Sequence, residues 1–128
     1  MVWISLNNGY YTTQFYSVAI DHGTPMSPII VAGAQDNNQQ MTIEFSRQAN
    51  WKTVYFGDGS YAQIDDGAKN FYFSKQEGKM IKATVDANMN RTAYRRIDPV
   101  GGKKYQFINP YILDPNNQNI MYLAGGKY

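Results

Sequence analysis

Short runs in which apolar and polar residues alternate follow one another along this chain, and turn-forming residues separate them. Three of these runs end in an aliphatic residue followed by aspartate, at residues 20–21, 64–65 and 113–114. A turn follows each pair, and after it comes a second apolar run, at residues 29–33, 70–74 and 120–125. Apolar or alternating runs of about four to eight residues between turns are typical of β-strands. The pattern therefore predicts the same strand–turn–strand unit three times.

A second marker repeats with a similar period. An aromatic residue opens a short strand-like run at Trp3, Trp51 and Tyr94, which are 48 and 43 residues apart. The aspartate markers are 44 and 49 residues apart, and further strand candidates lie at residues 41–45 and 80–85. Four strands in each period of about 40 to 50 residues are typical of the blades of a β-propeller. We therefore expect an all-β protein built from four-stranded antiparallel sheets.

The repeat divides the chain into units within a single domain, residues 1–128. Residues 9–56 and residues 57–99 are each expected to form one blade of four strands. Residues 105–128 supply two strands of a third blade, and residues 2–6 supply one outer strand. Gly, Pro, Asn and Asp interrupt the chain every eight to twelve residues or so, which leaves little room for helices.

Composition agrees with a folded, soluble domain and excludes several classes of function. Hydrophobic residues make up 43% of the 128 residues and charged residues 17%, which is too apolar for a disordered chain. The net charge of +2 is too weak for a nucleic-acid partner. No apolar run approaches the about 18 residues of a membrane span, and the first residues lack the pattern of a signal peptide. The chain has no Cys, which excludes disulfides and thiolate metal sites and leaves the compartment open.

Three segments resemble a known family of propellers. Residues 13–21 (TQFYSVAID), 33–38 (GAQDNN) and 57–59 (GDG) are similar to the BNR-repeat and sortilin-type propellers, whose relatives include glycoside hydrolases. The Asp-box of these families, S-x-D-x-G-x-x-W, has its nearest match at residues 84–91, where Asn88 replaces the glycine and Arg91 the tryptophan. The resemblance implies an exported protein with about two and a half propeller blades. With a degenerate Asp-box, it implies a fold more firmly than an activity.

The densest polar cluster, at residues 35–38, follows a strand that is expected to be buried, and Asp58 and Tyr61 lie where the next unit begins. One interpretation places these side chains on a rim of the propeller, where loops gather and a small polar ligand binds. The other is turn chemistry, because Asp and Asn side chains bond their own backbone. The Tyr61 ring either stacks on a sugar or a peptide or packs between blades. On the first interpretation, the residues that bind a glycan or a peptide are Gln35, Asp36, Asn37, Asp58 and Tyr61.

The candidate catalytic residues of this sequence give little support for an enzyme. Glycoside hydrolysis needs two carboxylates about 5 to 9 Å apart, and Asp36 and Asp58 are the best pair. Turns explain the positions of the other candidates, Asp21, Asp65, Asp66, Asp98 and Asp114. His22 is the single histidine, and neither a metal-ligand pattern nor a phosphate-binding loop is present, so we expect no metal and no cofactor. We predict a non-catalytic binding or scaffolding module; the alternative is a fragment of a secreted glycoside hydrolase with its carboxylates partly outside this chain.

The number of blades predicts self-association. Propellers close with about four to eight blades, whereas this sequence encodes two blades and parts of another. The final strand would leave backbone groups unpaired, and the outer faces of the first and last blades would expose apolar side chains. We therefore expect a homodimer in which residues 2–6 of one copy complete the third blade of the other, so that two copies form one ring.

Overall fold

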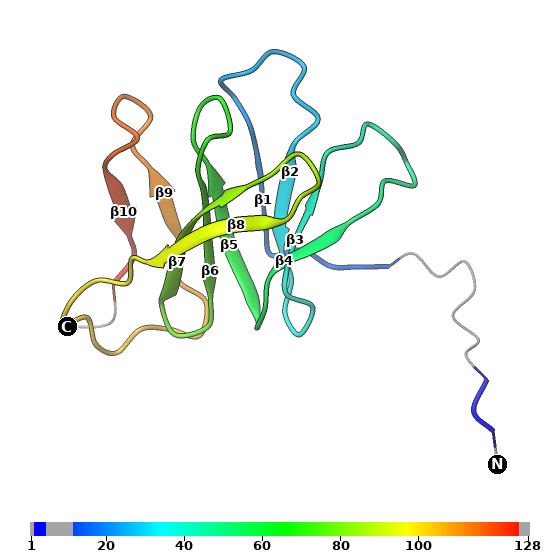
Figure 1. Cartoon of the computed structure of the whole chain (residues 1–128). Helices are drawn as coiled ribbons and strands as arrows, with labels where there is room; N and C mark the ends of the chain where they lie inside the picture. The colour runs from blue at the N-terminus through cyan, green and yellow to red at the C-terminus, as the bar shows by residue number, and fades with distance from the viewer. Residues whose placement is uncertain (1, 5–11, 126–128) are drawn as a thin grey trace.

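The computed structural model describes residues 2–4 and 12–125, which contain ten β-strands in three antiparallel sheets and no helix (Figure 1). The all-β class is thus confirmed for this part of the chain. The first sheet has the order β1-β2-β3-β4, with strands Ser17–Ile20, Ile30–Gly33, Gln39–Thr42 and Lys52–Tyr55. The second sheet has the order β5-β6-β7-β8, with strands Gly59–Ile64, Phe71–Lys75, Lys79–Val85 and Arg91–Arg96. A hairpin of two strands completes the structure, β9 (Tyr111–Leu113) and β10 (Met121–Leu123).

Most of the expected strands are present, with three differences. The strand expected to begin at Tyr94 begins at Arg91 instead, since β8 runs from Arg91 to Arg96. The strand expected at residues 41–45 is displaced, since β3 runs from Gln39 to Thr42. The reason is that Glu44 binds both the backbone and the side-chain N–H groups of Asn50 and so belongs to the β3–β4 loop. Residues 2–4 form no strand and are exposed. The remainder of the strand expected at residues 2–6, and residues 9–11 of the first unit, lie outside the described residues.

The larger core lies between the first and second sheets. Val31 and Met41 of the first sheet pack there with Phe71, Phe73 and Ile81 of the second. Because side chains alternate along a strand, the odd-numbered residues of β6 face this core and Tyr72 faces the opposite side. Tyr72 and Met80 form a smaller cluster there with Tyr111 and Leu113 of the hairpin. The strand β6 is therefore covered on both faces, and four of its five residues are buried.

The first and second sheets approach so closely at one end that only glycine fits. A β-carbon added at Gly33, the last residue of β2, would lie 1.8 Å from the backbone oxygen of Ser60. One added at Gly59, the first residue of β5, would lie 1.9 Å from the backbone oxygen of Asn38. Beside this contact, the buried amide of Gln39 donates to the carbonyl oxygens of Tyr61 (3.1 Å) and Ser74 (2.6 Å). These contacts fix the β2–β3 turn against the start of β5.

The periodic aspartates close the turn that follows the first strand of each sheet. Asp21 accepts hydrogen bonds from the backbone N–H groups of Gly23 (2.9 Å) and Gly67 (3.0 Å). Asp65 accepts from the backbone N–H of Asn70 at 2.7 Å. Asp114 accepts from the N–H groups of the next turn residues, Asn116 and Asn117. The periodic aspartates that mark the repeat thus stabilise turns, as expected for aspartates that directly follow a strand.

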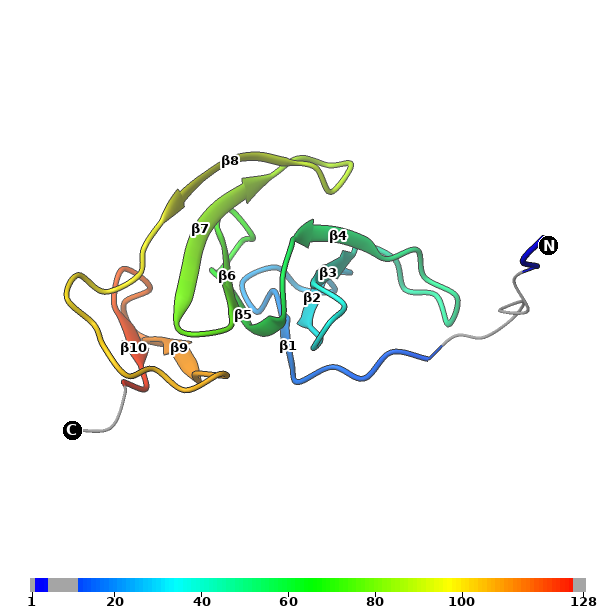
Figure 2. The same ribbon diagram turned by 90° about the horizontal axis from the view of Figure 1, so that it is seen from below.

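Two apolar patches, on β1 and on the hairpin, remain exposed in the described part of the chain, and Val18 of the first lines the same groove as Ile112 and Tyr122 of the second. On β1, Val18 and Ile20 are 57% and 46% exposed, while the alternate residue Ala19 packs against the larger core. On the hairpin, Ile112 and Tyr122 lie directly opposite each other and are both 56% exposed. Figure 2 shows the first strands β1, β5 and β9 along one side of the molecule and the last strands β4 and β8 on the other. β5 contacts both β1 and β9, so the first strands of the three sheets are neighbours.

Candidate functional site

The predicted residues Gln35, Asp36 and Asn37 form the turn between β2 and β3. The backbone N–H of Ala34 donates to the carbonyl of Asn38 at 3.0 Å, which closes the turn. Asp36 and Asn38 have φ angles of 56° and 66°. Asp and Asn adopt this left-handed conformation more readily than most residues, which explains why they occupy the turn. The side chains of residues 35–37 are exposed.

Asp58 reaches this turn from the segment before β5. Its Oδ1 accepts a hydrogen bond from the backbone N–H of Asp36 at 3.1 Å, and the side chain of Asn38 accepts from the N–H of Gly57 at 3.0 Å. The pKa of Asp36 is raised above its ordinary value, because its carboxyl group shares a hydrogen bond with that of Asp58 and lies in the field of its charge. The structure thus brings together two carboxyl groups that are 22 residues apart in the sequence.

Tyr61 does not join the other four predicted residues. It lies within β5 and its ring is 6.3 Å from that of Tyr111 in the hairpin. The backbone carbonyl of Tyr61 accepts hydrogen bonds from the side chains of Gln39, Ser74 and Tyr111. Together with Val18, Ile112 and Tyr122, Tyr61 lines a separate and mostly apolar groove of about 610 Å³. The packing interpretation therefore fits Tyr61 better than a place in the polar cluster.

Two grooves flank the β2–β3 turn. The smaller, of about 450 Å³, is lined by Gln35 and Asn37 together with residues of the segment that leads into β1. The hydroxyl of Tyr16 donates to Oε1 of Gln35 at its edge. The larger, of about 670 Å³, also includes Asn37 and extends to the β3–β4 loop. We call it the Phe15–Trp51 groove, after the two aromatic residues that line it.

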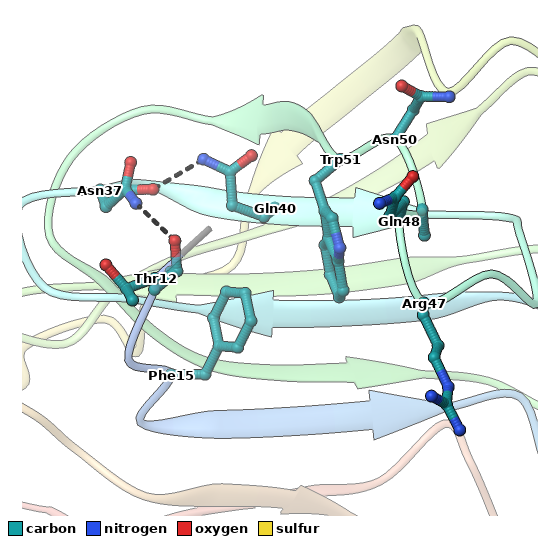
Figure 3. Close-up of a pocket in the computed structure, with 10 residues that line it drawn as sticks. Thr12, Phe15, Asn37, Gln40, Arg47, Gln48, Asn50 and Trp51 are labelled. Carbon is teal, nitrogen blue, oxygen red and sulfur yellow. Dashed lines mark hydrogen bonds between the residues drawn. The ribbon is translucent and has the colours of Figure 1, made fainter. Parts of the chain in front are cut away.

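Figure 3 shows the Phe15–Trp51 groove with its aromatic and polar side chains. The two rings are 5.1 Å apart between centroids, and Trp51 remains 40% exposed. The other lining residues are Thr12, Thr13, Asn37, Gln40, Arg47, Gln48, Ala49 and Asn50. Most of them carry hydroxyl, amide or guanidinium groups, so the groove combines an exposed aromatic surface with several hydrogen-bonding groups.

Hydrogen bonds hold two of the amides of this groove in position. The side-chain N–H of Gln40 donates to the carbonyl of Asn37 at 2.7 Å and to the hydroxyl of Thr53 at 3.1 Å. Asn50 donates to Glu44 through its backbone and its side chain, both at 3.0 Å. These bonds hold the pKa of Glu44 below its ordinary value, since they stabilise the charged carboxylate. Gln40 and Asn50 are therefore preorganised, whereas Arg47 and Gln48 extend from an exposed loop.

Sequence analysis did not find the Phe15–Trp51 groove. The sequence pattern identified Trp51 only as an aromatic residue that opens a strand. It identified Phe15 only as part of the segment that resembles the BNR-repeat and sortilin-type propellers. These two residues are 36 positions apart, and their contact depends on the pairing of β1 with β2 and of β3 with β4. The signal that was available was the polar loop at residues 46–50 directly before an aromatic residue.

The degenerate Asp-box forms the turn between β7 and β8. Asp86 accepts hydrogen bonds from the backbone N–H groups of Asn88 and Asn90, at 2.9 and 2.8 Å. Arg91, which stands where the family has tryptophan, lies over the rings of Tyr55 and Tyr94. Its guanidinium group also donates to the carbonyl of Val54 at 3.2 Å, so it links the second sheet to the first. Arg91 thus makes the contacts of a packing residue.

Comparisons with known proteins add no family to this description. No protein-family model matches the chain, and no curated protein is significantly similar to it in sequence. The resemblance to BNR-repeat and sortilin-type propellers therefore stays a prediction from the residues. Within residues 2–4 and 12–125, no three His, Asp or Glu side chains are placed to share a metal ion, and no helix is long and apolar enough to cross a membrane.

Proposed function

We propose that this chain is a non-catalytic binding module built as part of a β-propeller of BNR-repeat type. Propeller blades are four-stranded sheets arranged around a central channel. Three features support the proposal: two four-stranded sheets with strands in sequence order, face-to-face packing between them, and a third unit that begins with the same period. The contact of β5 with both β1 and β9 is the arrangement expected of innermost strands.

The proposed ligand is a carbohydrate bound in the Phe15–Trp51 groove. The observation that carries this proposal is the partly exposed indole of Trp51 beside a ring of amide and hydroxyl groups. Binding sites for small molecules combine aromatic surface with a few positioned polar groups, and this groove of about 670 Å³ lies within their usual size range. The apolar face of a sugar would stack on Trp51, and its hydroxyls would bond to Gln48 and Asn37.

The experiment is a titration with a panel of oligosaccharides, read by tryptophan fluorescence. The chain has two tryptophans, so the Trp3→Phe variant leaves Trp51 as the only reporter. We expect one class of glycan to change its emission with a saturable dependence on concentration. Gln48→Ala removes one hydrogen-bonding side chain of about 0.5 to 1.5 kcal/mol, so it should weaken binding by a few-fold to about tenfold.

The matched control is Gln106→Ala, which removes an exposed glutamine that does not line the groove. This variant should bind as the parent does. A panel in which no glycan changes the Trp51 emission would contradict the carbohydrate proposal and leave an interaction with another protein as the role of the module.

We also propose self-association, which a different observation favours. The outer faces of β1 and of the hairpin carry the exposed pairs Val18 with Ile20 and Ile112 with Tyr122. Apolar side chains gathered on a sheet face are typical of an interaction surface. In the proposed homodimer, the hairpin face of one copy meets the β1 face of the other, and residues 2–6 add a strand beside β10. Val18 and Gln40 lie in one cross-strand row, so the β1 surface and the Phe15–Trp51 groove are neighbours on one face of the first sheet. Self-association and carbohydrate binding are therefore tested with different variants.

Light scattering at micromolar concentration tests the homodimer. We expect twice the mass of one chain for the parent protein and the mass of one chain for Ile112→Lys and for a deletion of residues 1–7. Val100→Lys is the control, because Val100 is fully exposed in a loop outside both faces. A stable monomer for the parent protein, or a dimer that survives the deletion of residues 1–7, would exclude strand exchange.

The Asp36–Asp58 pair favours binding over glycoside hydrolysis. Hydrolysis needs the two carboxyl groups about 5 to 9 Å apart so that the scissile bond fits between them. Here the backbone N–H of Asp36 donates to Oδ1 of Asp58 at 3.1 Å, so the Asp58 carboxylate is engaged in holding the β2–β3 turn. Turnover of aryl glycosides that disappears in Asp36→Asn would establish the alternative, a fragment of a glycoside hydrolase.

A further inference from the structure

Three side chains form a row across the face of the second sheet that meets the hairpin. Tyr72 of β6 lies opposite Lys82 of β7, and Lys82 lies opposite Arg95 of β8. Tyr72 is buried against Tyr111 and Leu113. Lys82 is only half-buried and Arg95 is exposed, because the hairpin has two strands and the second sheet has four. The outer end of the row is therefore open.

Lys82 and Arg95 are a like-charge pair at directly opposed positions. Such pairs destabilise an antiparallel sheet, and a neighbouring carboxylate usually relieves them. No carboxylate forms an ion pair with Lys82 or Arg95 in the described part of the chain, where the ion pairs are Lys79 with Glu77 and Arg96 with Asp98. The ammonium group of Lys82 lies 5.4 Å from the centroid of the Tyr72 ring, which attracts the cation without neutralising it.

The two cations line a small groove of about 240 Å³ between the second sheet and the hairpin. Its other lining residues are Tyr72, Ile97, Leu113, Gln118, Asn119 and Met121, so the described lining has no acidic residue. The nearby turn carboxylate of Asp114 is already bonded to two backbone N–H groups and to the hydroxyl of Tyr122. A cleft with charges of one sign concentrates counter-ions.

Gln118 adds a directed donor to this groove. Its Oε1 accepts a hydrogen bond from the backbone N–H of Asp66 at 2.7 Å. Since the carbonyl oxygen of the amide is engaged, the N–H groups of Gln118 are the part that remains for a ligand. The groove thus offers an ammonium group, a guanidinium group and an amide donor.

We propose that this groove is an anion-binding site for the oxyanion of a small ligand, held between Lys82 and Arg95 with Gln118 as a further donor. Arg and Lys bind sulfate, phosphate and carboxylate oxygens through charge-assisted hydrogen bonds. The volume of about 240 Å³ is below that of most drug-sized sites, which suits a single anionic group. The site lies on the second sheet and does not depend on the carbohydrate proposal for the first.

Thermal unfolding in different anions tests this site. The melting temperature is measured in sulfate, phosphate and acetate, with chloride at matched ionic strength as the reference. We expect the melting temperature of the parent protein to rise in a saturable way with the anion that fits. A rise in sulfate and phosphate identifies a tetrahedral oxyanion, and a rise in acetate alone identifies a carboxylate.

Arg95→Gln is the decisive variant, because Arg95 is exposed and its loss opens no cavity. In chloride this variant should melt at a higher temperature than the parent, since the repulsion with Lys82 is gone. It should also lose the anion-dependent rise, with affinity reduced about tenfold or more. Lys69→Gln, an exposed lysine in the β5–β6 turn, is the control and should respond as the parent does.

Two results would overturn the proposal. One is a parent protein whose melting temperature is the same in all four salts. The other is an Arg95→Gln variant that keeps the full anion-dependent rise, which would place any anion effect elsewhere on the protein. NMR chemical shifts of the Arg95 and Gln118 amides during the sulfate titration give an independent readout of the same site.

Discussion

Where the first two sheets meet, individual residues determine how closely the two backbones approach. They also determine how the carboxyl groups of Asp36 and Asp58 interact. Gly33 and Gly59 each lie against a backbone oxygen of the other sheet. A few residues away, the raised pKa of Asp36 results from the hydrogen bond and the charge of Asp58. Both features connect the β2–β3 turn to the start of β5, so the candidate site and the sheet contact depend on each other.

Gly33→Ala should destabilise the protein strongly. The added β-carbon would lie 1.8 Å from a backbone oxygen, which cannot move aside as a flexible side chain can. We expect a loss of about 1 to 3 kcal/mol or more in the free energy of unfolding, measured by urea denaturation. Gly125→Ala is the control, because its β-carbon would meet nothing within 4 Å, and it should change stability by less than about 0.5 kcal/mol. Equal effects of the two substitutions would contradict the close approach.

The Asp36–Asp58 contact predicts a pH dependence of stability. Because the pKa of Asp36 is raised in the folded protein, its contribution is fully present below the unfolded value of 3.8 and is lost as pH rises through the folded pKa. Asp36→Asn should therefore be more stable than the parent at pH 7, with a difference that shrinks toward pH 3. Urea midpoints at both pH values measure this, and a difference that is larger at low pH would refute the sign.

The four-stranded sheet is the element that repeats, and its sequence pattern predicts it well. The turns explain this success, since aspartate, asparagine and glycine mark the ends of strands through local hydrogen bonds. β3 was displaced because Glu44 binds Asn50 in the following loop, which an alternating pattern does not reveal. The strand β6 begins with three consecutive aromatic residues rather than an alternating pattern, and the structure gives the reason: its two faces are buried against different sheets.

Phe73→Ala tests the place of β6 in the larger core. Phe73 is fully buried, and its ring lies 6.2 Å from that of Phe71 and 6.5 Å from that of Tyr55. We expect a loss of about 3 to 5 kcal/mol in the free energy of unfolding. Phe107→Ala is the matched control, because Phe107 is exposed in a loop, and it should cost less than about 0.5 kcal/mol. A small effect at Phe73 would show that the first and second sheets do not pack as described.

On the scale of the whole molecule, the sheets differ in how much apolar surface supports them. The first and second sheets share the larger core, whereas the hairpin rests on the cluster around Tyr72 and Tyr111. Its two strands have three residues each, and an isolated hairpin of this kind is marginally stable in water. The outer faces and the groove at Lys82 and Arg95 both adjoin this less supported end.

The hairpin should therefore open before the sheets do. In native-state hydrogen exchange, we expect the amides of β9 and β10 to exchange through a local opening of lower free energy than those of β2 and β6. The comparison is made at a protein concentration at which light scattering shows a single chain, so that self-association does not protect the hairpin. Equal protection of all three sheets would mean that the chain unfolds as one cooperative unit.

The local pattern was enough to predict most of the strands, their turns and the period of the repeat, because these depend on residues that are neighbours in the chain. It also placed Gln35, Asp36 and Asn37 in one turn, for the same reason. Contacts between distant segments bring Asp58 to this turn, place Tyr61 beside Tyr111 instead, and join Phe15 and Trp51 in one groove. Likewise, Lys82 and Arg95 oppose each other only through the register of β7 and β8, which shifts at Thr84 and Val85. Register and the stacking of sheets are set by contacts between distant segments, and local patterns do not record them.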